Sequence, residues 1–196
     1  MKLSRWFLAM GATAFFSGCA HPISVSPDVS KIENTGGHKR IEKNVGYYIS
    51  QEKKDLEVTT PGGGGDKIKY KPYGDIEIAL YKMLGNVFSD VTALKTPTDA
   101  ESIKQHKIVF VFTPAIATNS SSPSLLTWPP TQFTVNLTCN IMDSSGKVVA
   151  TKSVTGEGKA EWDEFKHDFS LSARRATQDA LLKMQEALLT SPDLRN

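Results

Sequence analysis

The strongest constraint on the fold is an alternating segment that runs from Gln132 to Met142. Its odd-numbered positions from 133 to 141 are apolar (Phe, Val, Leu, Cys and Ile), and the even-numbered positions between them are Thr or Asn. Side chains of a strand alternate between its two faces, so this pattern predicts a half-buried strand of an antiparallel sheet. Residues 143–146 (DSSG) favour a hairpin turn, and residues 147–155 are predicted to return as the partner strand.

Two longer segments each carry one apolar face at helical spacing. Residues 75–88 place apolar side chains three and four positions apart along their whole length, which predicts an amphipathic helix. A second helix is predicted to begin at Ser170 or Ser172 and to end near Leu189, with Pro192 just beyond it. One apolar face on each helix and on the strands predicts a single α+β domain. In it, two long helices pack on one face of a mainly antiparallel sheet.

Shorter patterns predict further strands at residues 45–49, 56–59, 67–71, 91–95 and 107–118, and a short helix from Thr98 toward His106. Pro114 interrupts one of these strands, which indicates a sheet edge or a bulge. Four consecutive glycines, residues 62–65, are one part of a phosphate-binding pattern. That pattern also needs Gly-Lys-Ser/Thr and a following helix, whereas Asp66 and a strand-like KIKYK follow here. We therefore predict a hairpin loop.

The N-terminus has the layout of an export signal. Lys2 and Arg5 give a short basic start, and an apolar stretch of 11 residues (WFLAMGATAFF) follows them. This stretch has the length of a signal-peptide core and is too short to span a bilayer as a helix. The small residues Ser17 and Gly18 follow this stretch and directly precede Cys19.

The sequence Phe16-Ser17-Gly18-Cys19 resembles the lipobox of bacterial lipoproteins, although that family usually has Leu where this chain has Phe16. The resemblance implies that residues 1–18 are a removed signal peptide and that the thiol of Cys19 carries diacylglycerol. An Asp directly after the cysteine would resemble an inner-membrane retention signal. Ala20 stands there instead, which implies a lipid anchor in the outer membrane.

The next segment, Ala20 to Asn44, is polar and contains two prolines and a Gly-Gly pair. We interpret residues 19–44 as the lipidated Cys19 followed by a flexible tether, and residues 45–196 as the folded domain, facing the periplasm. Removal of Lys2 and Arg5 leaves 21 of the 23 basic side chains, equal in number to the 21 acidic ones. A neutral domain lacks the charge of a nucleic-acid-binding protein, so we expect no nucleic-acid partner.

No constellation of residues favours catalysis or metal binding. The four histidines are scattered along the chain and lack metal-ligand spacing. Glu161, Asp163, Glu164 and Asp168 form an acidic cluster, which we interpret as a solvated loop rather than as acid/base residues. Cys139 lies on the apolar side of its strand and is predicted to be a buried small hydrophobe. We therefore expect that the protein is not an enzyme and that it has no catalytic residues, no cofactor and no metal.

The segment with the strongest claim to function is Asn119 to Thr131, which is rich in Ser and Pro yet contains Leu125, Leu126 and Trp128. Loops that carry large apolar side chains are often contact surfaces, and Trp favours both protein and membrane interfaces. These three residues are the candidate partner contact. The alternative is that they fold back as a lid over the sheet.

A lipobox, a tether, a strand-helix-strand unit, a long hairpin and a C-terminal helix together are similar to small envelope lipoproteins of Gram-negative bacteria. These include the YajG-like, lipopolysaccharide-assembly and transporter-auxiliary lipoproteins. The resemblance implies a non-enzymatic accessory subunit of an envelope assembly, transport or secretion complex, with an envelope protein as its partner. The alternative is a periplasmic carrier that binds a lipid or another apolar ligand between sheet and helices.

Overall fold

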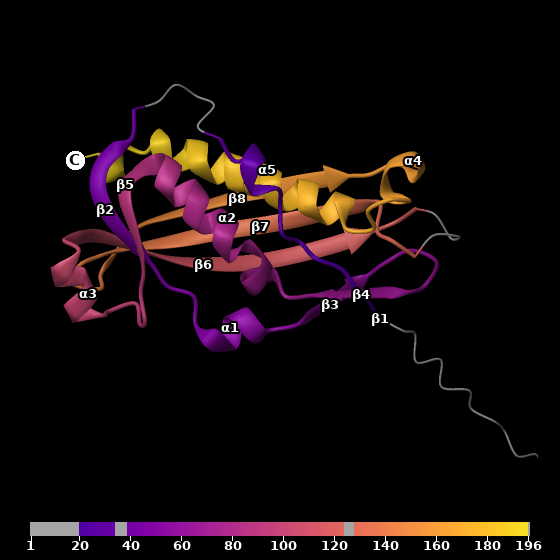
Figure 1. Ribbon diagram of the computed structural model, residues 1–196, viewed down its shortest axis with the longest axis horizontal. Helices are drawn as coiled ribbons and strands as arrows, with labels where there is room; N and C mark the ends of the chain where they lie inside the picture. Colours follow the sequence, from indigo (N-terminus) through magenta and orange to yellow (C-terminus); the bar gives the residue numbers. More distant parts are fainter. Residues whose placement is uncertain (1–19, 34–38, 124–127, 196) are drawn as a thin grey trace, which may run out of the picture.

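The computed structural model describes residues 20–33, 39–123 and 128–195, which form two sheets and their covering helices (Figure 1). The strands are β1 (Ala20–Pro22), β2 (Ile41–Tyr47), β3 (Val58–Pro61), β4 (Lys67–Tyr70), β5 (Phe88–Ala93), β6 (Ile108–Ser121), β7 (Gln132–Asp143) and β8 (Val148–Lys159). The helices are α1 (Gln51–Asp55), α2 (Pro72–Val87), α3 (Ala100–Gln105), α4 (Trp162–Phe165) and α5 (Leu171–Leu189).

The larger sheet has the strand order β5-β2-β6-β7-β8, and the smaller one has the order β1-β4-β3. The long ladders β6-β7 and β7-β8 are antiparallel, as the alternation and the DSSG turn predict. The strand β2 pairs parallel with both β5 and β6, which local sequence patterns do not reveal. Pro114 lies inside β6, which runs without a break from Ile108 to Ser121, so the predicted interruption is wrong. Pro114 is in register with Cys139 on β7 and lies just beyond Phe112, the last β6 residue in register with β2.

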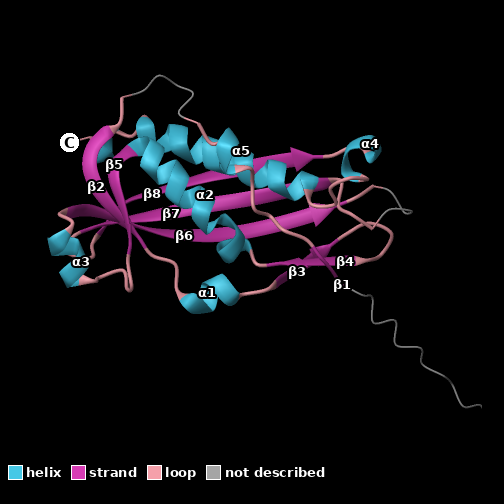
Figure 2. Ribbon diagram, viewed as in Figure 1, coloured by secondary structure: helices cyan, strands magenta, loops and turns pink. Residues whose placement is uncertain are grey.

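Helices α2 and α5 cover one face of the larger sheet, which confirms the predicted fold class (Figure 2). The core lies between these layers and contains fully buried side chains from both helices and the strands. Helix α5 lies directly on β8 because Gly156 and Gly158 face it without side chains. A Cβ at Gly158 would overlap the backbone of Ser172 and Ala176. Close backbone approach of this kind is one of the roles that only glycine fills.

The N-terminal segment departs from the predicted tether. Ala20–Pro22 forms β1, and the side chains of Val25 and Ile32 are 2% and 0% exposed in the core. The strand β2 already begins at Ile41, ahead of the predicted domain start at Val45. The tether prediction is therefore wrong for the described residues 20–33 and 39–44. Burial of a few apolar side chains, together with long-range hydrogen bonds, offsets the entropy lost by ordering this segment.

Candidate functional site beside the first strand

The start of β1 lies beside the glycine-rich hairpin that joins β3 and β4. Ala20 is in register with Lys67, and Ile23 N–H donates to Lys69 O at 3.0 Å. Residues 62–65 lie in the turn between β3 and β4, which confirms the predicted hairpin loop. Gly64 and Gly65 have φ values of 64° and 86°, in the left-handed region that glycine adopts at little cost. One end of the molecule therefore holds both the first described residue and this turn (Figure 1).

Three aromatic rings stack beside β1. The His21 ring lies 4.1 Å from the Trp128 ring, and the Trp128 ring lies 4.9 Å from that of Phe169, all measured between centroids. Trp128 also accepts a hydrogen bond at its backbone oxygen from Gly63 N–H at 2.7 Å. On the other side of His21, Nε2 lies 3.4 Å from Asp66 Oδ2. The stack thus connects β1, the glycine-rich turn and the segment before α5.

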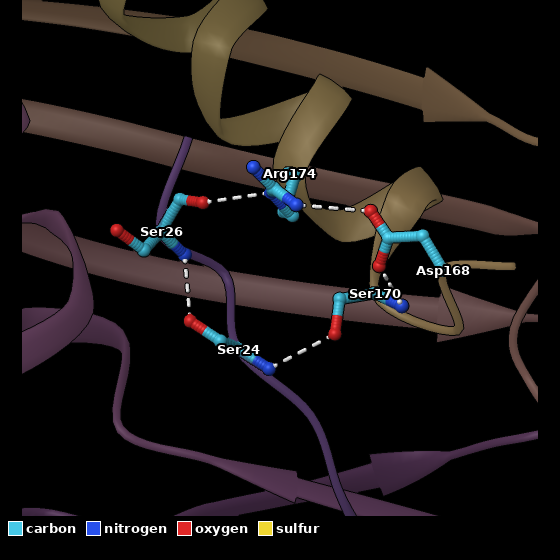
Figure 3. Close-up of polar contacts among 5 residues, drawn as sticks. All are labelled: Ser24, Ser26, Asp168, Ser170 and Arg174. Atoms are coloured by element: carbon cyan, nitrogen blue, oxygen red, sulfur yellow. Dashed lines mark hydrogen bonds and ion pairs between the residues drawn. The ribbon is translucent and has the colours of Figure 1, made fainter. Parts of the chain in front are cut away.

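Residues 23–33, here called the strap, cross from β1 to the helices and are held by polar contacts. Ser24 N–H donates to Ser170 Oγ at 3.2 Å, and Arg174 Nε donates to Ser26 O at 3.1 Å (Figure 3). Arg174 Nη1 in turn lies 3.0 Å from Asp168 Oδ2, with which it forms an ion pair. The hydroxyl of Ser170, predicted as a helix cap, makes no capping hydrogen bond and receives the strap instead.

The far end of the strap is fixed by two buried amides. Asn86 Nδ2 on α2 donates to Ile32 O and to Gln185 Oε1 on α5, both at 2.9 Å. Gln185 Nε2 donates to Glu33 O at 2.8 Å. Buried polar side chains are stable when each is paired, and here the pairs join the strap to both long helices. The strap is therefore an integral part of the domain.

Of the predicted site residues, only Trp128 lies in the described part of the chain. Its ring is half-buried and packs against the main core, so for Trp128 the structure matches the alternative that it folds back onto the domain. Cys19, Leu125 and Leu126 lie outside the described residues. Lipidation of Cys19 and the contact role of Leu125 and Leu126 stay predictions.

The acidic cluster belongs to helix ends and ion pairs. Glu164 closes a capping box with Glu161 and contacts Arg175 at 2.7 Å. The Arg175 hydrogen bond lowers the pKa of Glu164 to about 2. The predicted loop is in part a short helix, α4. Within residues 20–33, 39–123 and 128–195, no three His, Cys, Asp or Glu side chains are grouped as a metal site requires.

Cys139 is buried, as predicted from its place in the alternation. Burial raises the pKa of its thiol to about 12, because a thiolate would lose its hydration there. Such a group is chemically inert in the folded protein.

Sequence reasoning missed a second surface, the side of β6, β7 and β8 that faces away from α2 and α5. Among the rows of residues that cross these strands there, we call three adjacent rows in the middle the outward face; the next two rows, toward the end of β8, contain Glu157 and Lys159. The three rows of the outward face are Thr113, Asn140 and Thr151; Ala115, Thr138 and Ser153; and Ala117, Asn136 and Thr155. None of the nine is charged, and none is fully buried. The Thr/Asn alternation in residues 134–140 was the signal for this face.

The side chains of the outward face are fixed to one another. Thr155 Oγ1 donates to Asn136 Oδ1 at 2.6 Å, and Thr151 Oγ1 donates to Asn140 Oδ1 at 3.1 Å. Between these rows, the hydroxyls of Thr138 and Ser153 lie 2.8 Å apart. Fixed side chains lose little entropy when a partner covers them, so this face is preorganised for contact.

The free edge of β8, in contrast, is occupied by side chains of α5. Arg175 donates to Lys159 O at 2.8 Å, Asp179 accepts from Glu157 N–H at 2.9 Å, and Lys183 donates to Thr155 O at 3.0 Å. These three residues are spaced four apart and so lie on one stripe of α5. Side chains that satisfy an edge strand protect it from pairing with another chain.

Among the described residues, no helix is both long and apolar enough to cross a membrane. No family model matches the chain, and no curated protein is significantly similar in sequence.

Three solved structures are similar in architecture. A Xanthomonas campestris protein of the DUF330 family has 10% identity and a TM-score of 0.43, covering 87% of this chain and 91% of its own. The PelC dodecamer from Paraburkholderia phytofirmans has 12% identity and a TM-score of 0.44, covering 76% and 90%. A candidate lipoprotein from Caulobacter crescentus has 14% identity and a TM-score of 0.35, covering 68% and 86%. Identities and TM-scores this low assign the chain to no family.

Proposed function

We propose that this chain is an outer-membrane lipoprotein, anchored through Cys19, that acts as a non-enzymatic accessory subunit of an envelope assembly, transport or secretion complex. The mature protein would face the periplasm and contact an envelope protein partner. The outward face of β6, β7 and β8 is the single observation that carries the accessory role.

The anchor rests on the sequence before the domain. A basic start, an apolar core of signal-peptide length and Ser-Gly-Cys occur in the order that lipoprotein processing requires. Each buried methylene of an acyl chain contributes about 0.8 kcal/mol to membrane binding, so several chains on one cysteine would hold the protein stably.

The outward face supports a protein partner through its composition. Charged side chains are depleted in the buried centre of protein interfaces, because each one must be desolvated when the partner arrives. The nine residues of this face carry no charge, whereas the next two rows on β8 contain Glu157 and Lys159 and the chain as a whole is 22% charged. A partner that lies flat on the face fits better than an added strand, since α5 already occupies the β8 edge.

The alternative of an apolar-ligand carrier needs space between the sheet and the helices. Side chains of both helices fill that layer; Leu84 and Leu181, for example, are fully buried there. Against β8, α5 approaches so closely that not even a methyl group fits at Gly156 or Gly158. These observations favour the accessory role over ligand carriage.

The test introduces one charge on the outward face. Ala115 is exposed in its centre row, and Ala115→Glu would leave a buried, unpaired carboxylate in any complex formed there. Ala93→Glu is the matched control, because Ala93 is an exposed alanine on the edge strand β5. In-cell cross-linking of the full-length protein should capture fewer partners with Ala115→Glu and the wild-type set with Ala93→Glu. Unchanged capture with Ala115→Glu, at equal protein level, would exclude this face as the contact.

A further inference from the structure

We propose that the domain stands directly on the bilayer, with the start of β1, the glycine-rich turn and the His21–Trp128–Phe169 stack in contact with the lipid surface. We call this set the membrane-facing end. The inference rests on the proposed lipid anchor at Cys19 and adds the surface through which the folded domain meets the membrane.

The first argument is the distance between anchor and domain. Ala20 is already paired with Lys67, His21 with Ile68 and Pro22 with Lys69. Residue 19 is joined to Ala20 by one peptide bond, which separates the two Cα atoms by about 3.8 Å. A diacylglycerol on the residue-19 thiol therefore leaves no spacer between the acyl chains and β1.

The second argument is the rigidity of the attachment. Asp75, Ser170 and Arg174 hold the strap at residues 24–26, and Asn86 and Gln185 hold it at residues 32 and 33. Because these contacts lie on α2 and α5, β1 cannot swing away from the domain without breaking them. The anchor thus fixes which end of the domain approaches the membrane.

The third argument is the chemistry of that end. Phe169 is 47% exposed. Its ring lies against that of Trp128, and the Trp128 ring lies against that of His21. Aromatic side chains of this kind are enriched where protein meets the headgroup layer of a membrane. The turn itself has no bulky side chain, and the two charged residues that follow it, Asp66 and the exposed Lys67, are opposite in sign. The contact should therefore form on uncharged lipid and depend little on salt.

The arrangement also leaves the proposed partner surface accessible. Strand β8 runs from Val148 to Lys159, which spans about 36 Å at the usual rise per residue. The arrow of β8 starts at the opposite end of the molecule from the labels of β1 and β4 (Figure 1). An upright domain would hold the outward face along its side, away from the lipid.

The test uses fluorescence quenching of single-tryptophan forms of the mature lipidated protein in phosphatidylcholine vesicles with brominated acyl chains. Removal of residues 1–18 leaves two tryptophans, Trp128 and Trp162. Trp162→Phe makes Trp128 the reporter of the membrane-facing end. The far-end reporter is Val148→Trp in a Trp128→Phe, Trp162→Phe background, since Val148 is 53% exposed and tolerates a larger side chain.

We expect brominated lipid to reduce Trp128 emission about two-fold or more relative to unbrominated vesicles, with little change in high salt and little change for the Val148→Trp reporter. Equal quenching of the two reporters, or stronger quenching at position 148, would overturn the inference. Intact mass of the same preparation shows whether Cys19 carries lipid. A lipidated protein with unquenched Trp128 refutes only the orientation, whereas an unmodified Cys19 refutes the proposed anchor as well.

Discussion

Asp75 holds Val25 in place across 50 residues of sequence: its carboxylate Oδ2 accepts the Val25 N–H at 2.8 Å. The same oxygen accepts from Ser24 Oγ at 3.1 Å. Asp75 lies in the first turn of α2, where a carboxylate also interacts favourably with the helix dipole. A single side chain therefore couples the strap to one of the two long helices.

Replacing Asp75 should loosen the strap. Asp75→Ala leaves the Val25 N–H without its acceptor, and an unpaired buried donor costs about 1–3 kcal/mol. The free energy of unfolding from urea titration should fall by that amount, and the Val25 amide should exchange faster with solvent. Asp90→Ala, at an exposed carboxylate on β5, is the control and should change stability little. Equal stability of the two variants would show that Asp75 does not stabilise the strap.

The contact of α5 with β8 predicts an unusually costly alanine substitution. A Cβ at Gly158 would overlap backbone atoms of α5, which cannot move aside as a side-chain tip can. Gly158→Ala should lower the free energy of unfolding by about 3 kcal/mol or more. Gly85→Ala, on α2 with open space around the added methyl group, should raise it by about 0.5–1 kcal/mol. Thermal unfolding of both variants measures the difference, and a tolerated Gly158→Ala would refute the close packing.

Trp128 and Trp162 should differ in their effect on stability. Trp128 is half-buried between His21 and Phe169, whereas Trp162 is 60% exposed. Trp128→Ser should cost about 2–3 kcal/mol through lost packing, and Trp162→Ser should stay within about 0.5 kcal/mol of wild type. Denaturant unfolding of each variant is the measurement. If Trp128→Ser is as stable as Trp162→Ser, the aromatic stack contributes nothing to the fold.

Glu164 predicts a pH dependence with a defined sign. Its pKa is lowered from 4.5 to about 2, chiefly by the hydrogen bond from Arg175. A depressed pKa in the folded state gives stability that is present above pH about 4.5 and is lost as pH falls toward about 2. The Tm difference between wild type and Glu164→Gln should therefore shrink across that window. A difference that stays constant with pH would show that the ionised pair does not stabilise the domain.

Local patterns predict the parts of this fold that bury a continuous face. The apolar stripe of α2 and the alternation of β7 each repeat over many residues, so both elements were predicted close to their observed bounds. The strap was missed because its apolar residues (Ile23, Val25, Val29 and Ile32) are separated by polar residues at no regular spacing, and their partners are far away in sequence. The parallel pairing of β2 likewise depends on which strands meet in space, which no local period specifies.

The candidate site was likewise predictable from the sequence only in part. Trp128 was identified as a large aromatic residue in a segment rich in Ser and Pro. Its position against His21, in contrast, required the placement of β1. The outward face was present in the sequence as the polar half of the β7 alternation. Its extent became visible only when the register placed Ala115 and Ser153 on either side of Thr138.

The most direct measurement is in-cell cross-linking of wild type and Cys19→Ala at matched protein level, followed by purification and mass spectrometry. The proposed function predicts a defined set of envelope proteins captured by the lipidated wild type, and loss of that set when the anchor is removed. The same set captured by Cys19→Ala would contradict the claim that lipid on Cys19 places this domain beside its partner.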